Sequence, residues 1–326
     1  MIPFNYKRAS KSVDAIAAAT AESSSYLAGG TTLIDLMKLN VMAPQTLVDI
    51  NKLKLADIEE KGDNVTIGAL VKNSDLAHHP LILRNFPLLS EALLSGASPQ
   101  LRNMASVGGN IMQRTRCYYF RDSALPCNKR EPGSGCPAIE GQNRIHAILG
   151  GSDHCIAVNP SDMCVALMAL EAVINTSGPQ GSRSIPIENF HVLPGVHPEI
   201  ETVLDSGALI ESITIPLHRR NKNSHYLKVR DRASYAFALV SAAVALEIER
   251  GEIKSARVAL GGVATKPWRA VEAEKVLVGN KTGRELYREA GEAALRNARG
   301  YAHNAFKIEL TKRVIVRALE KAEAIG

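Results

Sequence analysis

The first 50 residues alternate short apolar runs with polar turns, a pattern that predicts strand, helix, turn, helix and strand. A buried strand is expected over 25–28, and Gly29-Gly30 ends it. A helix follows over 33–38, with Thr31 or Thr32 at its N-cap and Asp35 placed as in a capping box. Residues 46–50 predict the returning strand.

Farther along, the alternation of Val65, Ile67 and Ala69 predicts a strand over 64–70, and an apolar stretch predicts a helix over 88–95. Residues 185–217 are expected to form a loop-rich connection that ends in a strand at 211–216, and the polar stretch 219–223 is a predicted linker. After the linker we expect a small sheet covered by helices. Its strands are predicted over 226–230, 237–248 and 255–263, and its helices over 269–278, 283–296 and 302–324.

Composition narrows the class of protein. The chain has 326 residues, enough for two domains, and its 45% hydrophobic and 22% charged content is typical of a globular protein. The net charge of +6 comes without a block of basic residues, and aromatic residues are only 5%, which argues against nucleic-acid binding. Residues 1–21 lack the apolar run of a signal peptide, and no stretch is apolar enough to cross a membrane. We therefore expect no membrane insertion and no export signal of its own.

Two glycine pairs indicate an anion site. A strand, a glycine pair, a threonine and a helix start can hold a diphosphate, because glycine lets the backbone approach and a helix start offers N–H donors. Ser106-Val107-Gly108-Gly109-Asn110 predicts a second tight turn that could close on the same ligand. The spacing is not that of the Rossmann fingerprint, and the alternative is a pair of turns that bind nothing.

Four of the five cysteines fall in one segment, with the spacing C-x9-C-x8-C-x18-C: Cys117, Cys127, Cys136 and Cys155. This spacing matches neither a zinc ribbon nor a ferredoxin, so it leaves open a [4Fe–4S] cluster, a zinc site, and unpaired or disulfide-bonded cysteines. The Pro and Gly residues beside the thiols favour a cluster, because irregular backbone can bring thiols together and offer N–H donors to sulfur. The basic residues nearby could offset the cluster's charge or form a solvated surface: Arg114, Arg116, Arg121, Lys129 and Arg130.

Other candidate side chains have mostly structural interpretations. Cys164 lies in an apolar helix and is expected in the core, and His146 and His154 are expected to be structural hydrogen-bonding residues. Asp162 could cap that helix or accept hydrogen bonds from a ribose. No acid–base pair or nucleophile stands out, so no catalytic residue is predicted.

Several motifs, in order along nearly the whole chain, resemble the FAD-binding subunit of the xanthine dehydrogenase / molybdenum hydroxylase family. They are Ala28-Gly29-Gly30-Thr31-Thr32-Leu33, Ser106-Val107-Gly108-Gly109-Asn110, Pro160-Ser161-Asp162, Lys228-Val229-Arg230 and the segment 261–269. Most members lack a cysteine loop. The segments around Cys117, Cys127 and Cys136, with residues 231–240, are most similar to the flavin and [4Fe–4S] subunits of bacterial periplasmic aldehyde oxidoreductases.

The resemblance implies an α+β fold: a two-lobed FAD-binding domain of the vanillyl-alcohol-oxidase type over 1–218, then a smaller α+β domain over 222–326. The lobes would cover about 1–55 and 56–218, with an iron–sulfur loop inserted at about 113–157. It implies that Cys117, Cys127, Cys136 and Cys155 bind a [4Fe–4S] cluster, that Asp162 meets the ribose side and that Lys228 lies near the isoalloxazine ring. The other implied FAD-binding residues are Leu27, Ala28, Gly29, Gly30, Thr31, Thr32, Leu33, Ile34, Ser106, Gly109, Asn110 and Ile210.

The implied function is electron transfer in a heterotrimer. A large molybdopterin subunit would oxidise an aldehyde to a carboxylic acid, a small subunit would carry two [2Fe–2S] clusters, and this chain would pass electrons through FAD to an external acceptor. The alternatives are the flavin subunit of a 4-hydroxybenzoyl-CoA reductase-like enzyme and a zinc-stapled, non-catalytic interaction module. Co-export to the periplasm with a partner that carries a twin-arginine signal is favoured over a cytoplasmic location.

Overall fold

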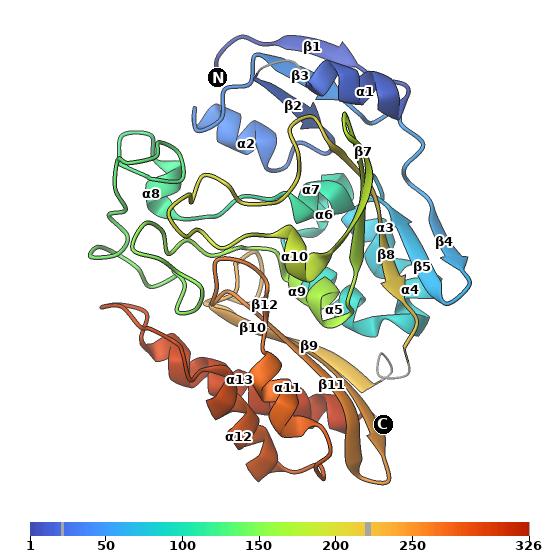
Figure 1. Cartoon of the computed structure of the whole chain (residues 1–326), viewed down its shortest axis with the longest axis vertical. Helices are drawn as coiled ribbons and strands as arrows, with labels where there is room; N and C mark the ends of the chain where they lie inside the picture. The colour runs from blue at the N-terminus through green and yellow to red at the C-terminus, as the bar shows by residue number, and fades with distance from the viewer. Residues whose placement is uncertain (21–22, 219–222, 326) are drawn as a thin grey trace.

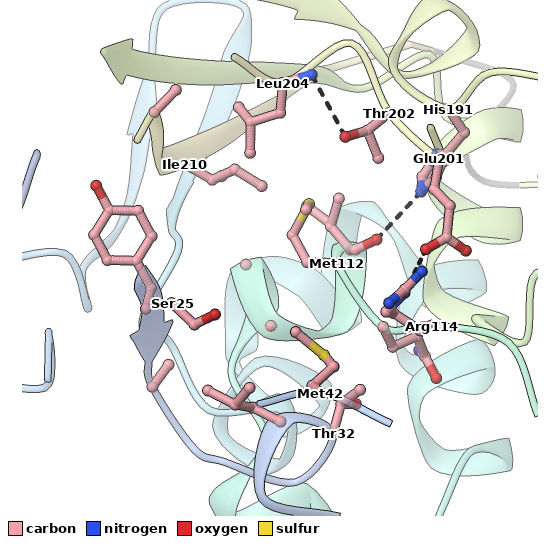
Figure 2. Close-up of a pocket in the computed structure, with 18 of the residues that line it drawn as sticks. Ser25, Thr32, Met42, Met112, Arg114, His191, Glu201, Thr202, Leu204 and Ile210 are labelled. Carbon is pink, nitrogen blue, oxygen red and sulfur yellow. Dashed lines mark hydrogen bonds and ion pairs between the residues drawn. The ribbon is translucent and has the colours of Figure 1, made fainter. Parts of the chain in front are cut away.

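The computed structural model describes residues 1–20, 23–218 and 223–325, and three sheets with their helices follow one another along its long axis (Figure 1). The first two face each other across a large cavity, part of which Figure 2 shows. This mixed α+β architecture, with a smaller C-terminal unit, agrees with the predicted fold class. In the described ranges, no helix is both long and apolar enough to traverse a lipid bilayer.

The first lobe is a parallel three-stranded sheet in the order β1-β3-β2, which confirms the strands predicted near 25–28 and 46–50 and the helix predicted over 33–38. Its elements are β1 (Asn5–Arg8), α1 (Ser12–Ala19), β2 (Ser24–Leu27), α2 (Leu33–Lys38) and β3 (Thr46–Asp49). The predicted capping box does not form, because Thr32 occupies the N-cap without a side-chain bond. Asp35 instead accepts hydrogen bonds from Arg116 and Arg121, both at 2.8 Å, and two guanidinium groups bind a carboxylate more strongly than a local backbone bond does.

The second lobe is an antiparallel five-stranded sheet in the order β4-β5-β8-β6-β7. Its strands are β4 (Ile58–Lys61), β5 (Asn64–Gly68), β6 (Val173–Gly178), β7 (Gly181–Pro186) and β8 (Leu209–Pro216). Its helices are α3 (Asn73–His78), α4 (Pro80–Asn85), α5 (Pro87–Ser95), α6 (Pro99–Met104), α7 (Val107–Ile111), α8 (Tyr118–Arg121), α9 (Asp162–Ala169) and α10 (Ile187–Phe190). The strand at 64–70 and the helix at 88–95 are confirmed, whereas the β6–β7 hairpin was not predicted. Helix α9 is buried throughout from its second residue and includes Cys164, as expected.

The C-terminal unit is an antiparallel sheet in the order β12-β11-β10-β9, with helices packed on one face, as predicted (Figure 1). Its elements are β9 (Asn223–Val229), β10 (Val240–Glu249), β11 (Glu252–Gly261), β12 (Trp268–Arg269), α11 (Val271–Leu277), α12 (Arg284–Ala294) and α13 (Phe306–Glu323). Strand β10 starts three residues later than predicted, so that Phe237 lies in a loop with its side chain 49% exposed. Residues 219–222 of the predicted linker lie outside the described residues.

The segment between α7 and α9 carries the four clustered cysteines and contains a single short helix, α8, in its described residues. It is fixed by contacts with all three parts of the molecule. Asp35 of the first lobe binds it through two arginines. The N–H groups of Ile148 and Leu149 donate to the carbonyl of Val263, which follows β11. A loop with little secondary structure of its own therefore takes its shape from its surroundings.

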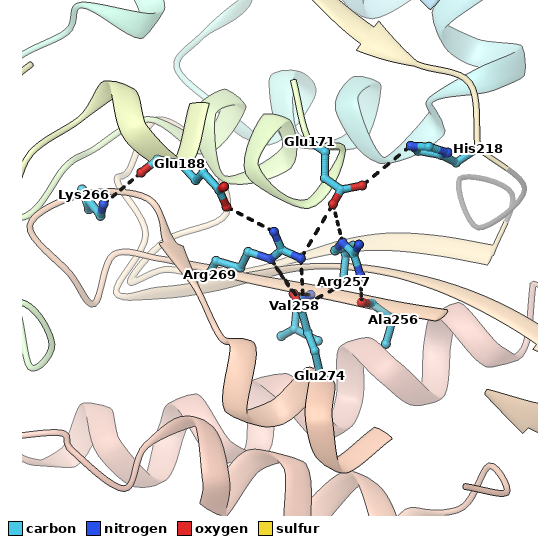
Figure 3. A network of polar contacts seen from close by, with 9 residues as sticks. All are labelled: Glu171, Glu188, His218, Ala256, Arg257, Val258, Lys266, Arg269 and Glu274. Atoms are coloured by element: carbon cyan, nitrogen blue, oxygen red, sulfur yellow. Dashed lines mark hydrogen bonds and ion pairs between the residues drawn. The ribbon is translucent and has the colours of Figure 1, made fainter. Parts of the chain in front are cut away.

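An ion-pair network joins the second lobe to the C-terminal sheet (Figure 3). Arg257 of β11 binds Glu171, at the end of α9, at 2.8 Å. Arg269 binds Glu188 of α10 at 3.2 Å and Glu274 of α11 at 3.1 Å. Glu274 is only 6% exposed and also accepts the N–H of Val258 at 3.0 Å. Because Glu274 is buried and fully engaged, its removal would take the closest carboxylate from Arg269 and leave the Val258 N–H without its acceptor.

We expect Glu274→Ala to lower the free energy of unfolding by about 3 kcal/mol, because the substitution breaks a buried, hydrogen-bonded ion pair. Urea unfolding followed by circular dichroism would measure the loss. Glu272→Ala is the matched control, since Glu272 lies on the same helix with its side chain 54% exposed and pairs only across the surface with Lys275. Equal unfolding midpoints for the two variants would contradict the role assigned to Glu274.

Candidate functional site

A cavity of about 720 Å³ lies between the first and second lobes (Figure 2). Most of its wall residues lie within the segments 23–33, 106–115, 155–160 and 191–210, although not every residue of these segments faces the cavity. Figure 2 shows Ser25 and Thr32 on one side and Thr202, Leu204 and Ile210 on the other. Both glycine pairs line this cavity, so the two predicted anion-binding segments face the same cavity.

The glycines have different physical roles. A Cβ on Gly29 would lie 1.9 Å from the carbonyl oxygen of Met104, so Gly29 permits a close backbone contact between the lobes. Gly30 has φ +70°, a conformation that favours glycine. Gly109 is not in a tight turn as predicted but in helix α7, whose N-cap Ser106 accepts the Gly109 N–H at 3.3 Å. A Cβ on Gly109 would meet only the Ser106 hydroxyl within 4 Å, which leaves the space before it open for a ligand.

Nine of the predicted FAD-binding residues line the large cavity: Ala28, Gly29, Gly30, Thr31, Thr32, Leu33, Ser106, Gly109 and Ile210. Leu27 and Ile34 do not line it and lie beside Gly30. Asn110 also lies off the cavity wall, because its side-chain oxygen accepts a 2.7 Å hydrogen bond from Ser161, the N-cap of α9. Asn110 therefore fixes helix α7 to helix α9.

Asp162 and Lys228 are not on the wall of the large cavity; they form a buried ion pair with each other. The distance from Lys228 Nζ to Asp162 Oδ2 is 2.8 Å, with the side chains 3% and 10% exposed. Asp162 also accepts a 2.6 Å hydrogen bond from Tyr226, and burial together with this carboxylate raises the pKa of Tyr226 well above its usual value. Asp162 is the first residue of α9 rather than its cap. Asp162 and Lys228, which were predicted to contact different parts of a nucleotide, thus bind each other.

Asp162 lines a second cavity, of about 370 Å³, that adjoins the first. The two cavities share Thr115 and residues 158–160 as a common wall. Arg116 and the exposed Phe237 form part of the outer lining, and the Arg116 guanidinium lies 5.1 Å from the centre of the Phe237 ring. An elongated ligand with a polar middle could therefore occupy the first cavity and extend toward the second.

The structure brings Cys117, Cys127, Cys136 and Cys155 together around a third, small cavity of about 10 Å³. Burial raises the pKa of Cys117 to about 12 and that of Cys155 to about 11. Among the described residues, no three His, Cys, Asp or Glu side chains are arranged to hold a single metal ion. Cys136 is the most exposed of the four thiols.

Hydrogen bonds shape the loop around these sulfurs. The N–H of Ala157 donates to Cys155 Sγ at 3.4 Å, and His146 Nε2 lies 3.1 Å from Cys117 Sγ. Asn128 and Gly135 exchange two hydrogen bonds, at 2.9 and 2.7 Å, which close the turn between Cys127 and Cys136. N–H donors directed at sulfur are typical of iron–sulfur sites, where they tune the metal centre.

The small cavity and the large cavity share a wall made by Lys129, Cys155 and Ala157. Lys129 Nζ binds Glu201 at 3.1 Å, and Glu201 also binds Arg114, which faces the large cavity in Figure 2. These two cations lower the pKa of the Glu201 carboxyl, against the opposing effect of burial. The ion-pair triad joins the cysteine loop to the large cavity and leaves a net positive charge between the two cavities.

His191 and Glu201 line the wall but were not predicted as part of a binding site, and Arg114 was predicted only as a possible counter-charge for a cluster. Burial lowers the pKa of His191 to about 4, and its Nε2 lies 3.2 Å from the carbonyl oxygen of Ile111. His191 and Glu201 lie in the segment predicted to be a loop-rich connection, and loop composition alone does not show which side chains face a cavity.

The FAD-binding domain of molybdopterin dehydrogenases matches residues 2–218, and the C-terminal domain of CO dehydrogenase flavoproteins matches residues 225–322. The chain is 46% identical over 327 residues to the aldehyde oxidoreductase FAD-binding subunit PaoB of Escherichia coli K12, covering 99% of each chain. It belongs to the molybdopterin dehydrogenase FAD-binding family.

More distant members agree in fold. The chain is 28% identical to the carbon monoxide dehydrogenase medium chain of Afipia carboxidovorans, and the alignment covers 99% of each chain. A solved structure of carbon monoxide dehydrogenase from Hydrogenophaga pseudoflava superimposes with a TM-score of 0.78 at 26% identity, covering 100% of this chain and 99% of that one. The two family domains thus account for nearly the whole chain.

In this family member, Gly109→Leu should weaken FAD binding by at least about tenfold, because the new side chain would enter the cavity in front of Ser106. FAD content after purification, and fluorescence titration of the FAD-free protein, would measure the effect. Gly283→Leu is the control, since a Cβ there meets nothing within 4 Å and the residue lies outside the cavity. Full flavin occupancy in Gly109→Leu would show that the nucleotide binds elsewhere.

Proposed function

We propose that this chain is the electron-transfer subunit of a molybdenum-dependent aldehyde oxidoreductase and carries both FAD and a [4Fe–4S] cluster. One observation carries the proposal: four cysteines line a small cavity, and this cavity shares a wall with the large, nucleotide-sized cavity. The 46% identity to an aldehyde oxidoreductase FAD-binding subunit supports the substrate class.

The large cavity fits a dinucleotide. Its glycines admit a diphosphate against the backbone, and its polar side chains can hydrogen-bond hydroxyl groups. Asp162 and Lys228 form a buried ion pair beside the second cavity. These two residues would therefore influence a flavin ring in that cavity electrostatically. FAD would supply two-electron redox chemistry, while this chain binds it, orients it and limits water around it.

The cysteine cavity has the donor set that a [4Fe–4S] cluster needs. Four thiols converge, N–H groups point at sulfur, and Lys129 brings positive charge next to Cys155. Each thiolate of such a cluster binds its own iron, whereas the four ligands of a zinc ion share one centre about 2.3 Å away. A free space of about 10 Å³ holds roughly one water, so cluster binding requires the thiol groups to move apart.

A subunit with these features needs partners. Similarity to the FAD-binding subunit of an aldehyde oxidoreductase and to the medium chain of a carbon monoxide dehydrogenase supports this. We propose a heterotrimer in which a large molybdopterin subunit oxidises the aldehyde and a small [2Fe–2S] subunit delivers the electrons to this chain. An external acceptor would take them from FAD.

Cys136→Ser should remove about four irons per chain, the content of one [4Fe–4S] cluster, and leave most of the FAD bound. Iron and flavin analysis of the purified complex, together with its visible spectrum, would test this. Cys164→Ala is the matched control, because Cys164 is buried in helix α9 and should not affect iron content. Unchanged iron in Cys136→Ser, or stoichiometric zinc in the unsubstituted protein, would refute the cluster.

A further inference from the structure

His146 is the one imidazole in the described part of the cysteine loop that is placed against a thiol. Its Nε2 lies 3.1 Å from Cys117 Sγ, and the residue is 1% exposed. Its Nδ1 is buried, and no hydrogen-bond partner for that atom is found among the described residues. The ring therefore directs one nitrogen at sulfur and leaves the other unpaired.

The C-terminal unit fixes the backbone that carries this ring. The carbonyl oxygen of His146 accepts Lys307 Nζ at 2.9 Å and Asn304 Nδ2 at 3.2 Å. Lys307 and Asn304 are fully buried at the start of α13, and the N–H of His146 donates to the carbonyl of Asn143 at 2.9 Å. A residue whose main chain is held from two sides has little freedom to withdraw from its sulfur neighbour.

The chemistry of the contact fixes the direction of its hydrogen bond once metal is bound. A metal-bound Cys117 is a thiolate and has no proton to give, so in a hydrogen bond between these two side chains the imidazole must be the donor. A neutral imidazole has a single N–H, and an unpaired Nδ1 is consistent with that proton on Nε2.

We propose that His146 is a positioning residue that raises the reduction potential of the cluster by donating its Nε2–H to the Cys117 sulfur. The inference rests on the proposed function, since it requires a cluster on the four cysteines. A bound cluster would supply one-electron chemistry, and His146 would keep its Nε2 proton while the electron is added, so no proton would be transferred. The added negative charge spreads onto the ligating sulfurs, so an N–H donor stabilises the reduced state more than the oxidised state.

The test compares His146→Leu and His146→Gln in the purified complex with its FAD and iron. Leucine fills the space without a donor, whereas the amide nitrogen of glutamine can occupy the position of Nε2. A dithionite titration with redox mediators, followed by the EPR signal of the reduced [4Fe–4S] cluster, measures the potential. We expect His146→Leu to lower the equilibrium constant for reduction of the cluster about tenfold, which shifts its reduction potential by about 59 mV to a more negative value. In His146→Gln, most of the native potential should be retained.

His303→Leu serves as the control, because His303 is exposed, does not line the small cavity and contacts Asn143 only through its backbone N–H. Its potential should equal that of the unsubstituted protein. Equal potentials for native, His146→Leu and His146→Gln proteins would overturn the inference, as would loss of the cluster in His146→Leu, since the residue would then serve assembly. An absence of iron in the native protein would instead refute the proposed function itself.

Discussion

The ammonium group of Lys307 holds together the part of the molecule on which the proposed chemistry depends. It is fully buried, and it donates to the carbonyl oxygens of His146, in the cysteine loop, and of Gly262, after β11. Burial lowers its pKa to about 7, a sign of how unfavourable the charge is at this position. A buried cation is tolerated only where acceptors surround it, so α13, β11 and the cysteine loop must meet there.

This junction explains how a segment with little regular structure can present four thiols to one point. The ion pairs of Asp35 fix its beginning, the paired turn of Asn128 and Gly135 fixes its middle, and Val263 and Lys307 fix its end. The same loop supplies Lys129 and Cys155 to the wall of the large cavity. The cysteine loop therefore forms part of the wall of the large cavity. If each site held its cofactor, only a few side chains would lie between the two cofactors.

Most regular elements could be predicted from the sequence because their apolar periodicity is strong, as in the first lobe and the C-terminal sheet. The β6–β7 hairpin was missed because Gly181–Pro186 is mostly exposed and lacks an apolar face. The glycine pairs and the four cysteines were recognised as candidates from motif and spacing. Their convergence, the pairing of Asp162 with Lys228, and the contact of His146 with Cys117 all join residues far apart in the chain, which local patterns do not encode.

The most direct test of this account is a crystal structure of the FAD-loaded protein with anomalous diffraction recorded at the iron edge. The account predicts a four-iron peak enclosed by Cys117, Cys127, Cys136 and Cys155, with the FAD diphosphate against Gly30 and Gly109 in the adjoining cavity. An iron-free cysteine cavity, or a nucleotide bound outside the space between the two lobes, would contradict it.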